Sequence, residues 1–167
     1  MTMLVIRPAL PADVPQIGQL IRELATYERE PAKAVATDED LLRDGFGPQP
    51  RYFCLIAEWD GAAAGFAFYF HNYSTWLGRW GLFLEDLFVR PAFRGRGIGK
   101  ALLVELARIA VREGCGRINW HVLEWNTPAL QFYESLGARA LRDWVIMRLD
   151  GEAIERLAGG RVDSPHD

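Results

Sequence analysis

The sequence has few residues suited to metal binding, with two cysteines and three histidines among 167 residues. Cys54 and Cys115 lie far apart, and the chain contains neither a Cys-x-x-Cys pair nor a Cys/His cluster. Structural zinc sites are built from such clusters, so we expect no metal. We expect both thiols to be buried and reduced, as in a cytoplasmic protein.

Membrane and export signals are also missing. Residues 1–6 have no apolar segment behind a basic one, so we expect no signal peptide. The apolar run at residues 62–70 is far too short to span a bilayer, and we expect no membrane partner. The net charge of −3 gives no sign of bulk binding to nucleic acid.

The remaining composition is that of an ordinary globular protein, half hydrophobic and one quarter charged. Its length suits one domain with a substantial core, which we place at residues 1–158. The tail at residues 159–167 is small and polar, and we expect it to be disordered.

Hydrophobic periodicity and turn residues predict the element order β-α-α-β-β-β-α-β-α-β and a short terminal helix. A mixed sheet with helices on both faces is the natural packing of these elements. Strands are predicted at residues 3–7, 52–59, 64–69, 82–89, 117–123 and 144–149. Helices are predicted from Asp13 toward Glu28, from Thr37 to Gly45, from the glycine loop to Gly114, and at residues 128–136 and 152–157.

The most informative segment, residues 85–100, is a strand that leads through a glycine-rich loop into a helix. Gly95, Gly97 and Gly99 allow a ligand to approach the backbone closely, because they carry no Cβ. The unpaired N–H groups at the start of a helix favour an anion. Positive charge comes from Arg94, Arg96 and Lys100. The segment therefore predicts a polyanion site that suits a pyrophosphate.

Two familiar phosphate motifs do not fit this segment. A P-loop needs Ser or Thr after its lysine, and Ala101 follows Lys100 here. A dinucleotide fingerprint needs Gly-x-Gly-x-x-Gly, whereas this spacing is tighter. The plain alternative is a strand-to-helix turn with solvated arginines.

Two adjacent acids, Glu85 and Asp86, interrupt the apolar strand that precedes the loop. Consecutive strand residues face opposite sides, so at least one of these carboxylates points toward a covered face. A buried carboxylate is costly without a partner, so it should have a partner or a chemical role. An ion pair with Arg7 or Arg117 is the structural alternative.

The sequence RGRGIG at residues 94–99 resembles the acetyl-CoA pyrophosphate loop of the GNAT superfamily of N-acetyltransferases. The segments LEDLFV at residues 84–89 and EWNTPALQFY at residues 124–133 are similar to the diamine and thialysine N-acetyltransferase branch. IRPA at residues 6–9, IRELATYE at residues 21–28 and DGFG at residues 44–47 agree. The likeness runs from about residue 3 to residue 149.

The resemblance implies an α/β fold whose central sheet is mixed, mostly antiparallel and about six to seven strands wide. It implies acetyl-CoA as co-substrate and a homodimer, for which Trp76 and Trp80 are candidate interface residues. The implied cofactor contacts include the whole loop at residues 94–100, Ile98 among them. Outside the loop they are Leu87, Phe88, Val89, Asn126, Pro128 and Ala129. Asn126 has a second interpretation as a helix cap.

The resemblance also implies catalytic roles. Acetyl transfer to an amine needs a base for the ammonium, because alkylammonium groups have a pKa near ~10. It also needs a proton for the departing thiolate after a tetrahedral intermediate. Glu85 is the implied base, acting through water, or the substrate anchor. Tyr133 is the implied acid, although its helical position also suits a core tyrosine.

The implied acceptor site is for a small-molecule amine and comprises Tyr27, Glu28, Glu85, Asn119, Trp120 and His121. Aromatic rings and carboxylates suit a cation, but Tyr27 and Glu28 also fit an exposed helix end, and His121 a structural role. The chain departs from the diamine enzymes in two segments. These are Glu134–Leu136, which is not basic, and the short connection at residues 138–143, which carries Arg139 and Arg142. A smaller amine such as thialysine therefore remains open.

Two other functions remain open at this point. One is acetylation of protein N-termini or lysines, which needs a long open groove for a peptide. The other is a non-catalytic acyl-CoA-binding domain, which would keep the glycine loop but have no use for Glu85 or Tyr133.

Overall fold

The computed structural model describes residues 3–161. The chain divides into two compact units, Met1–His121 and Val122–Asp167, and each is described here by itself. The single domain at residues 1–158 therefore stays a prediction. Residues 162–167 of the expected disordered tail lie outside the described residues.

The first unit contains one sheet with the strand order β1-β2-β3-β4-β5. Neighbouring strands are antiparallel from β1 to β4, and β5 runs parallel to β4. The strands are β1 Leu4–Pro8, β2 Phe53–Trp59, β3 Ala62–Ser74, β4 Arg79–Val89 and β5 Ile118–Trp120. The α/β fold with a mixed, mostly antiparallel sheet is confirmed. The described part of the chain has five strands, fewer than expected.

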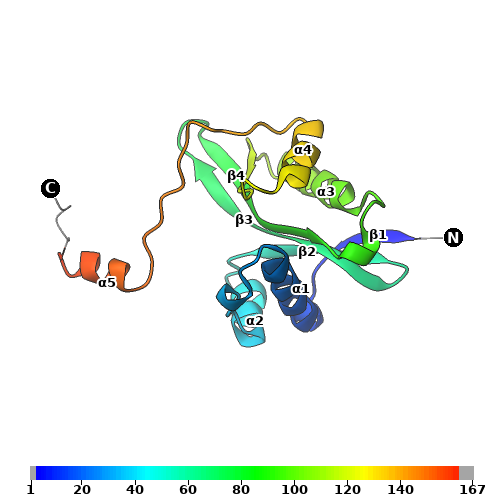
Figure 1. The fold of residues 1–167 in the computed structure, drawn as a ribbon, viewed down its shortest axis with the longest axis horizontal. Coiled ribbons are helices and arrows are strands. Elements are labelled where there is room, and N and C mark those ends of the chain that lie inside the picture. The colour runs from blue at the N-terminus through cyan, green and yellow to red at the C-terminus, as the bar shows by residue number, and fades with distance from the viewer. Residues whose placement is uncertain (1–2, 162–167) are drawn as a thin grey trace. The chain divides into compact units, whose positions relative to one another are not determined.

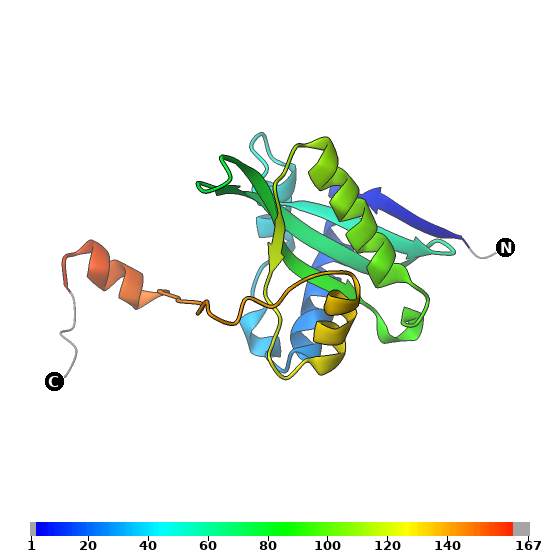
Figure 2. The ribbon, with the colours of Figure 1, turned by 90° about the horizontal axis from the view of Figure 1, so that it is seen from above.

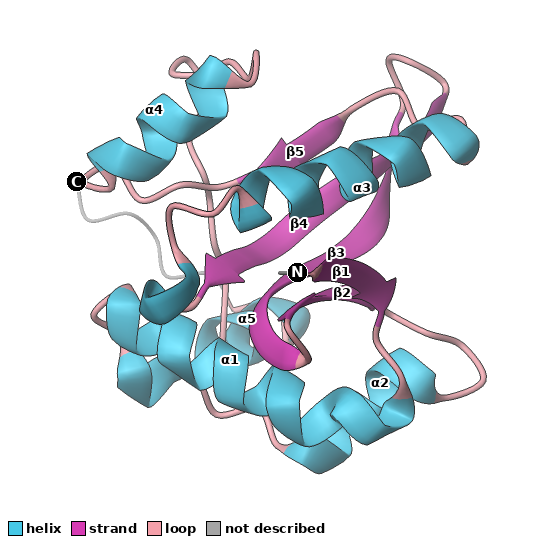
Figure 3. Ribbon diagram, turned by 90° about the vertical axis from the view of Figure 1, so that its right-hand side faces the viewer, coloured by secondary structure: helices cyan, strands magenta, loops and turns pink. Residues whose placement is uncertain are grey.

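Helices cover both faces of this sheet (Figure 1). α1 Val14–Tyr27 and α2 Asp38–Phe46 lie on one face, and α3 Ile98–Arg112 lies on the other (Figure 3). Two apolar cores result, one under α3 and one under α1 and α2. Figure 2 shows α3 crossing the strands obliquely.

The sequence predicts α3 well, because its helical signals are local. Ile98, Leu102, Leu106 and Ile109 recur on one face, and all four side chains are buried. Gly114 follows the helix with a φ of 70°, the left-handed conformation expected of a residue that ends a helix.

The β3–β4 hairpin is longer than its sequence suggests. The sequence predicts a polar loop at residues 71–78, but its first half, residues 71–74, belongs to β3, because His71 pairs with Leu82 and Tyr73 with Trp80 across the ladder. The turn is closed at Ser74, whose hydroxyl accepts a hydrogen bond from the backbone N–H of Leu77. Residues 71–74 therefore extend β3, and residues 75–78 form the turn.

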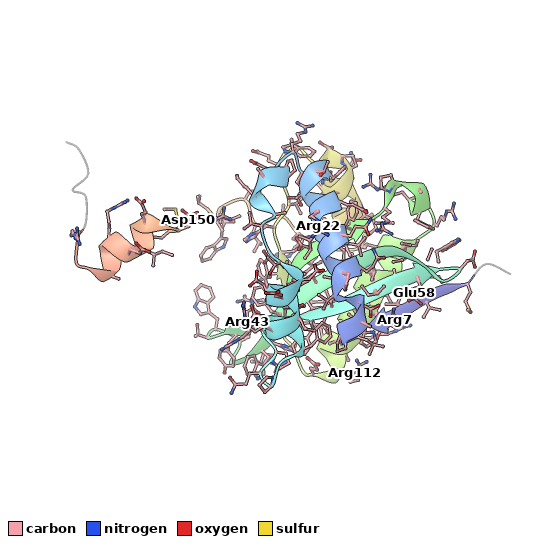
Figure 4. The ribbon with its side chains drawn as sticks, turned by 90° about the horizontal axis from the view of Figure 1, so that it is seen from below. Arg7, Arg22, Arg43, Glu58, Arg112 and Asp150 are labelled. Atoms are coloured by element: carbon pink, nitrogen blue, oxygen red, sulfur yellow. The ribbon has the colours of Figure 1, made fainter. Side chains whose placement is uncertain are left out.

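The sequence predicts Asp13 as the N-cap of the first helix, and Asp13 does hold the N-cap position of α1, but its side chain does not cap the helix. The Asp13 carboxylate makes no capping bond to α1 and instead accepts one from the backbone N–H of Leu10. It also pairs with Arg7 at 2.7 Å, which holds the pKa of Asp13 below its usual value. Arg7 further pairs with Glu58, beside it in Figure 4, so this network ties β1 to β2.

The second unit contains α4 Thr127–Ser135 and α5 Glu152–Ala158, which matches two predicted helices. The predicted strand at residues 144–149 is wrong, since no described strand pairs with this stretch. Its apolar side chains are exposed, as illustrated by Met147 at 86 %. A strand needs a partner for its backbone groups, and this one has none among residues 3–161. Over the same residues, no helix is long and apolar enough to cross a bilayer.

Candidate active site

A bulge in β4 places the two adjacent acids. Opposite Phe68 the strand has Asp86, but opposite Tyr69 it has Leu84, so Glu85 is the extra residue. Such a bulge reverses the alternation of side chains along a strand. Leu84 belongs to the core under α3, whereas Phe88 belongs to the core under α1. Asp86 shares the parity of Phe88 and therefore faces α1, and Glu85 is left exposed.

The same point in β4 is where its pairing with β5 stops. The last parallel pair is Leu84 with Trp120, immediately before the bulge. Among the described residues no strand pairs with β4 on this side over residues 85–89. The backbone of Leu87, Phe88 and Val89, the predicted contacts for the pantetheine arm, therefore offers an open strand edge that leads toward the glycine loop.

The glycine loop presents bare backbone at the start of α3. Gly95 and Gly97 both have a φ of 75°, a conformation that favours glycine. A Cβ on either residue would meet no described heavy atom within 4 Å, so packing does not require glycine here. Gly97 precedes the first helical residue, Ile98, and no described side chain caps the helix. Gly99 and Lys100 lie in the first turn, whose N–H groups remain available to an anion.

Arg94 and Arg96 are both exposed, and both also contact neighbouring residues. Arg94 donates a hydrogen bond from Nε to the Val89 carbonyl at 2.9 Å. Its guanidinium also lies 4.8 Å from the centre of the Tyr27 ring. Arg96 stacks on Trp59 at 5.1 Å. These contacts join the loop to β4, to the end of α1 and to the end of β2.

A broad groove of about 520 Å³ begins at this loop and follows the exposed side of α3. Gly97 and Lys100 line its start, and Val104 and Arg108 lie further along the helix. β1 forms the opposite wall through Leu4. Glu105 also lines the groove and pairs with Arg108 at 3.4 Å, so Lys100 supplies the positive charge next to the loop.

Three carboxylates gather where α1 ends and β4 bulges. Burial, together with the charges of Glu85 and Glu28, raises the pKa of Asp86 to about 7. Burial and the charge of Glu85 also raise the pKa of Glu28. Arg7 pairs with Asp13 and Glu58 and not with this cluster. No described cation pairs with Glu85 or Asp86, so the ion-pair alternative is wrong for both.

The predicted acceptor residues separate into two groups. Tyr27 ends α1 and Glu28 follows it. The Arg94 guanidinium of the loop lies over the Tyr27 ring, and the charge of Glu85 acts on Glu28. Asn119 lies on β5 and pairs with Phe83 of β4. The His121 ring packs edge-on against the Phe83 ring, with 5.0 Å between the ring centres.

Trp120 is the exception among these acceptor residues. It packs against the core under α3, the face opposite to Asp86, which gives it a structural role. Its acceptor role stays a prediction without support from this packing.

The remaining predicted residues lie on α4 in the second unit. The Asn126 side chain accepts a hydrogen bond from the Ala129 N–H at 3.4 Å, so its capping role is realised. Pro128 occupies the first turn. The Tyr133 ring packs against Phe132 at 5.3 Å. The cofactor role of Asn126, Pro128 and Ala129 and the acid role of Tyr133 stay predictions.

Sequence reasoning missed a clamp next to the loop. Arg90 follows β4 directly and binds the Glu23 carboxylate through two nitrogens, at 2.9 and 3.0 Å. A third nitrogen of Arg90 donates to the Ala63 carbonyl at 2.8 Å. The clamp joins α1 to the end of β4, and its sequence signal is no more than an arginine before a proline.

We expect Glu23→Gln to lower the free energy of unfolding by about 1–2 kcal/mol, between the values for exposed and buried pairs. The matched control is Glu30→Gln, which breaks the exposed pair with Lys33 and should change stability by less than about 0.5 kcal/mol. Urea midpoints measure both variants. Equal midpoints would show that the clamp adds nothing to stability.

No cluster of three or more metal-ligating side chains occurs within residues 3–161. A model of the acetyltransferase (GNAT) family matches residues 17–138, which is most of the chain. The chain belongs to the GNAT family of acetyltransferases. Members of this family use acetyl-CoA, and the glycine loop and the carboxylate cluster both lie inside the matched range.

Two relatives and one solved structure show which GNAT proteins this chain is similar to. It is 39 % identical over 170 residues to the thialysine N-epsilon-acetyltransferase of Bos taurus, covering 95 % of this chain and 99 % of that one. It is 37 % identical to the spermidine/spermine N(1)-acetyltransferase-like protein 1 of Homo sapiens, covering 92 % of this chain but 23 % of that protein. An integron cassette protein from the mobile metagenome of V. cholerae matches at a TM-score of 0.78 and 28 % identity, covering 93 % and 97 % of the two chains. The resemblance to the diamine and thialysine branch is confirmed.

Proposed function

We propose that this acetyltransferase moves the acetyl group of acetyl-CoA to a primary amine of a small molecule, such as a diamine, a polyamine or a thialysine-like amino acid. One observation carries the proposal: the open edge of β4 leads from a cluster of unpaired carboxylates to bare backbone at a helix start. A cation is favoured at one end of this edge and a pyrophosphate at the other.

The donor half of the site rests on backbone groups. The N–H groups at the start of α3 bind the pyrophosphate, and Lys100 adds charge beside them. The amides of the pantetheine arm pair with Leu87–Val89 as an added strand would. A backbone N–H group of β4 near the bulge polarises the thioester carbonyl during attack.

The acceptor half rests on the carboxylates. Glu85, exposed at the bulge, attracts and anchors the ammonium group, and Glu28 adds negative charge beside it. Asp86, with its pKa raised to about 7, is the group best matched to take a proton at neutral pH, directly or through water. Tyr27, Asn119 and His121 shape the pocket for the rest of the amine. Tyr133 donates a proton to the departing thiolate.

The choice of amine rests on the relatives and on the charges near α4. By their names, one relative acts on thialysine and the other is a protein like spermidine/spermine N(1)-acetyltransferase. Arg139 and Arg142 follow α4, where the diamine enzymes are more acidic. An acceptor with several positive charges gains less from such a segment, so we favour a small amino-acid-like amine over a polyamine.

Product analysis by mass spectrometry tests this function. The protein is mixed with acetyl-CoA and, separately, with thialysine, spermidine, putrescine and a lysine-containing peptide. We expect acetylated thialysine to form fastest and the peptide to remain unmodified. Acetylation of the peptide alone would replace this function with protein acetylation, and no turnover with any acceptor would favour a non-catalytic acyl-CoA-binding domain.

We further propose that the protein is a cytoplasmic homodimer. Both cysteines are free thiols, in agreement with a reducing compartment. Trp76 and Trp80 are exposed on the β3–β4 hairpin, and the apolar stretch at residues 144–149 is exposed without a partner strand. A second copy that pairs with this stretch would bury apolar side chains on both of its faces.

We therefore expect Ile146→Asp to convert the dimer into a monomer, because it places a charge in the centre of this stretch. Val111→Asp is the matched control, since Val111 is also apolar and exposed but lies on α3. Size-exclusion chromatography with light scattering gives the mass of each variant. A dimer that survives Ile146→Asp would exclude this stretch from the interface.

A further inference from the structure

The end of α1 carries two of the proposed acceptor residues beyond its last apolar anchor. Leu24 is the last buried residue of the helix, and Tyr27, which ends it, is 38 % exposed. Glu28 follows Tyr27 directly. Apolar burial fixes the helix as far as Leu24, so other contacts must set how closely its last turn approaches β4.

Electrostatic repulsion acts against this approach. The charges of Glu85 on β4 and of Glu28 at the end of α1 both raise the pKa of Asp86, and the charge of Glu85 also raises the pKa of Glu28. β3 places the uncharged Phe68 opposite Asp86. β2 brings the Cys54 thiol, whose pKa is raised by burial, so that it stays neutral. Once Asp86 ionises, the end of α1 is therefore repelled from β4 unless a contact holds it.

The clamp between Arg90 and Glu23 is such a contact. Glu23 lies one helical turn before Tyr27, and its carboxylate accepts two hydrogen bonds from Arg90, at 2.9 and 3.0 Å. Arg90 is itself tied to β3, because its backbone N–H donates to the Ala64 carbonyl and its Nη1 to the Ala63 carbonyl, both at 2.8 Å. The planar guanidinium therefore fixes α1 relative to the sheet in one geometry.

A second contact follows one turn further along α1. Arg94, four residues after Arg90, has its guanidinium 4.8 Å from the centre of the Tyr27 ring, and Tyr27 is four residues after Glu23. Residues four apart lie on the same face of a helix, so both contacts join one face of α1 to the connection between β4 and α3. A contact between a cation and an exposed ring is weaker and less directional than a two-bond ion pair, so the clamp carries most of the restraint.

We propose that Arg90 is a positioning residue for the acceptor site: through Glu23 it holds the end of α1, with Glu28, against the two acids of β4. Neither Glu23 nor Arg90 is among the groups whose charge acts on Asp86. The clamp therefore acts on Asp86 through the position of Glu28. Its role for the amine rests on the function proposed above, whereas its effect on the titration of Asp86 does not.

Carboxyl ¹³C NMR of aspartate-labelled protein measures this effect without any turnover. The Asp86 signal is the one that is missing from Asp86→Asn, and in the parent protein it should titrate at about pH 7. Glu23→Gln opens the clamp and lets Glu28 recede, so the midpoint should fall to about 6.5 as one like charge moves away. Arg90→Lys keeps one charged contact with Glu23 and should shift the midpoint less.

Glu58→Gln is the matched control. Glu58 also pairs with an arginine, and its side chain is 26 % exposed against 32 % for Glu23. Its partner Arg7, labelled beside it in Figure 4, also binds Asp13 at the start of α1, so this pair lies at the other end of the helix. The control should lower the urea midpoint, as Glu23→Gln does, and leave the titration of Asp86 in place.

Kinetics with an accepted amine give a second readout. Glu23→Gln should raise KM for the amine and leave KM for acetyl-CoA unchanged, because Glu28 belongs to the acceptor half of the site. The rise in kcat/KM with pH should move to lower pH together with the titration of Asp86.

Three results would overturn the positioning role: an unchanged Asp86 titration in Glu23→Gln, an equal shift in Glu58→Gln, or a rise in KM for acetyl-CoA alone. The first would leave Arg90 with a structural role, the second would tie the shift to lost stability, and the third would assign the clamp to the donor half. If no amine is acetylated but Glu23→Gln still shifts the titration of Asp86, the proposed function fails and the positioning of Glu28 by the clamp stands.

Discussion

The Gly97→Ala variant should bind acetyl-CoA about 100-fold more weakly than the parent protein, a loss of about 2.7 kcal/mol. A Cβ at this position points into open space at the start of α3, where the pyrophosphate must approach the backbone. The added methyl group therefore keeps the phosphates away from the N–H groups of the first helical turn. Isothermal calorimetry with acetyl-CoA measures the change.

The chain offers a matched control for this variant at the other end of the same helix. Gly114 has a φ of 70°, close to the 75° of Gly97, and a Cβ there also meets open space. Alanine in this conformation costs roughly 1–2 kcal/mol at either site, so both variants should lose similar stability. We expect Gly114→Ala to bind acetyl-CoA normally. Equal affinities in the two variants would contradict the pyrophosphate site.

The glycine loop and α3 can be read from the sequence because their signals are local. The spacing of Ile98, Leu102 and Leu106 fixes the buried face of the helix, and Gly97 and Gly114 mark its two ends. The resemblance then supplies what spacing cannot, namely that the ligand is acetyl-CoA. Both steps use residues that lie within about 20 positions of one another.

Features that depend on pairing between distant segments cannot be predicted from the sequence. The bulge at Glu85 exists because β3 and β4 shift register between Phe68 and Tyr69. The alternation of side chains along a strand predicts that Glu85 and Asp86 face opposite sides of the sheet, but it does not predict which of them faces α1. The clamp between Glu23 and Arg90 joins residues that are 67 positions apart. The stretch at residues 144–149 has a strand pattern, yet no strand forms without a partner.

Asp86→Asn should lower kcat by about 100-fold or more, the range found when a general base is removed. Burial and two neighbouring charges raise the pKa of Asp86 to about 7, so its basic form is populated only above that pH. In the parent protein kcat/KM should rise as pH increases through about 7. The variant should lose this rise, which a pH–rate profile with a fixed amine measures.

Stability gives an independent check on the same carboxyl group. An unfolded aspartate has a pKa near ~3.9, so between about pH 4 and 7 the folded protein binds more protons than the unfolded chain. The contribution of Asp86 to stability is thus fully present below the lower value and is lost as pH rises to about 7. Asp86→Asn should therefore be more stable than the parent at pH 8. A variant that gains stability and loses activity has lost a functional group and not its fold.

Glu85→Gln separates the two acids. The charge of Glu85 helps to raise the pKa of Asp86, so its removal should move the rise in kcat/KM to lower pH and leave the rise in place. Because Glu85 anchors the ammonium, this variant should raise KM for the amine more than it lowers kcat. If Glu85→Gln abolishes the rise in kcat/KM with pH and Asp86→Asn retains it, Glu85 is the residue that takes the proton. Asp86 would then act only as a neighbouring negative charge.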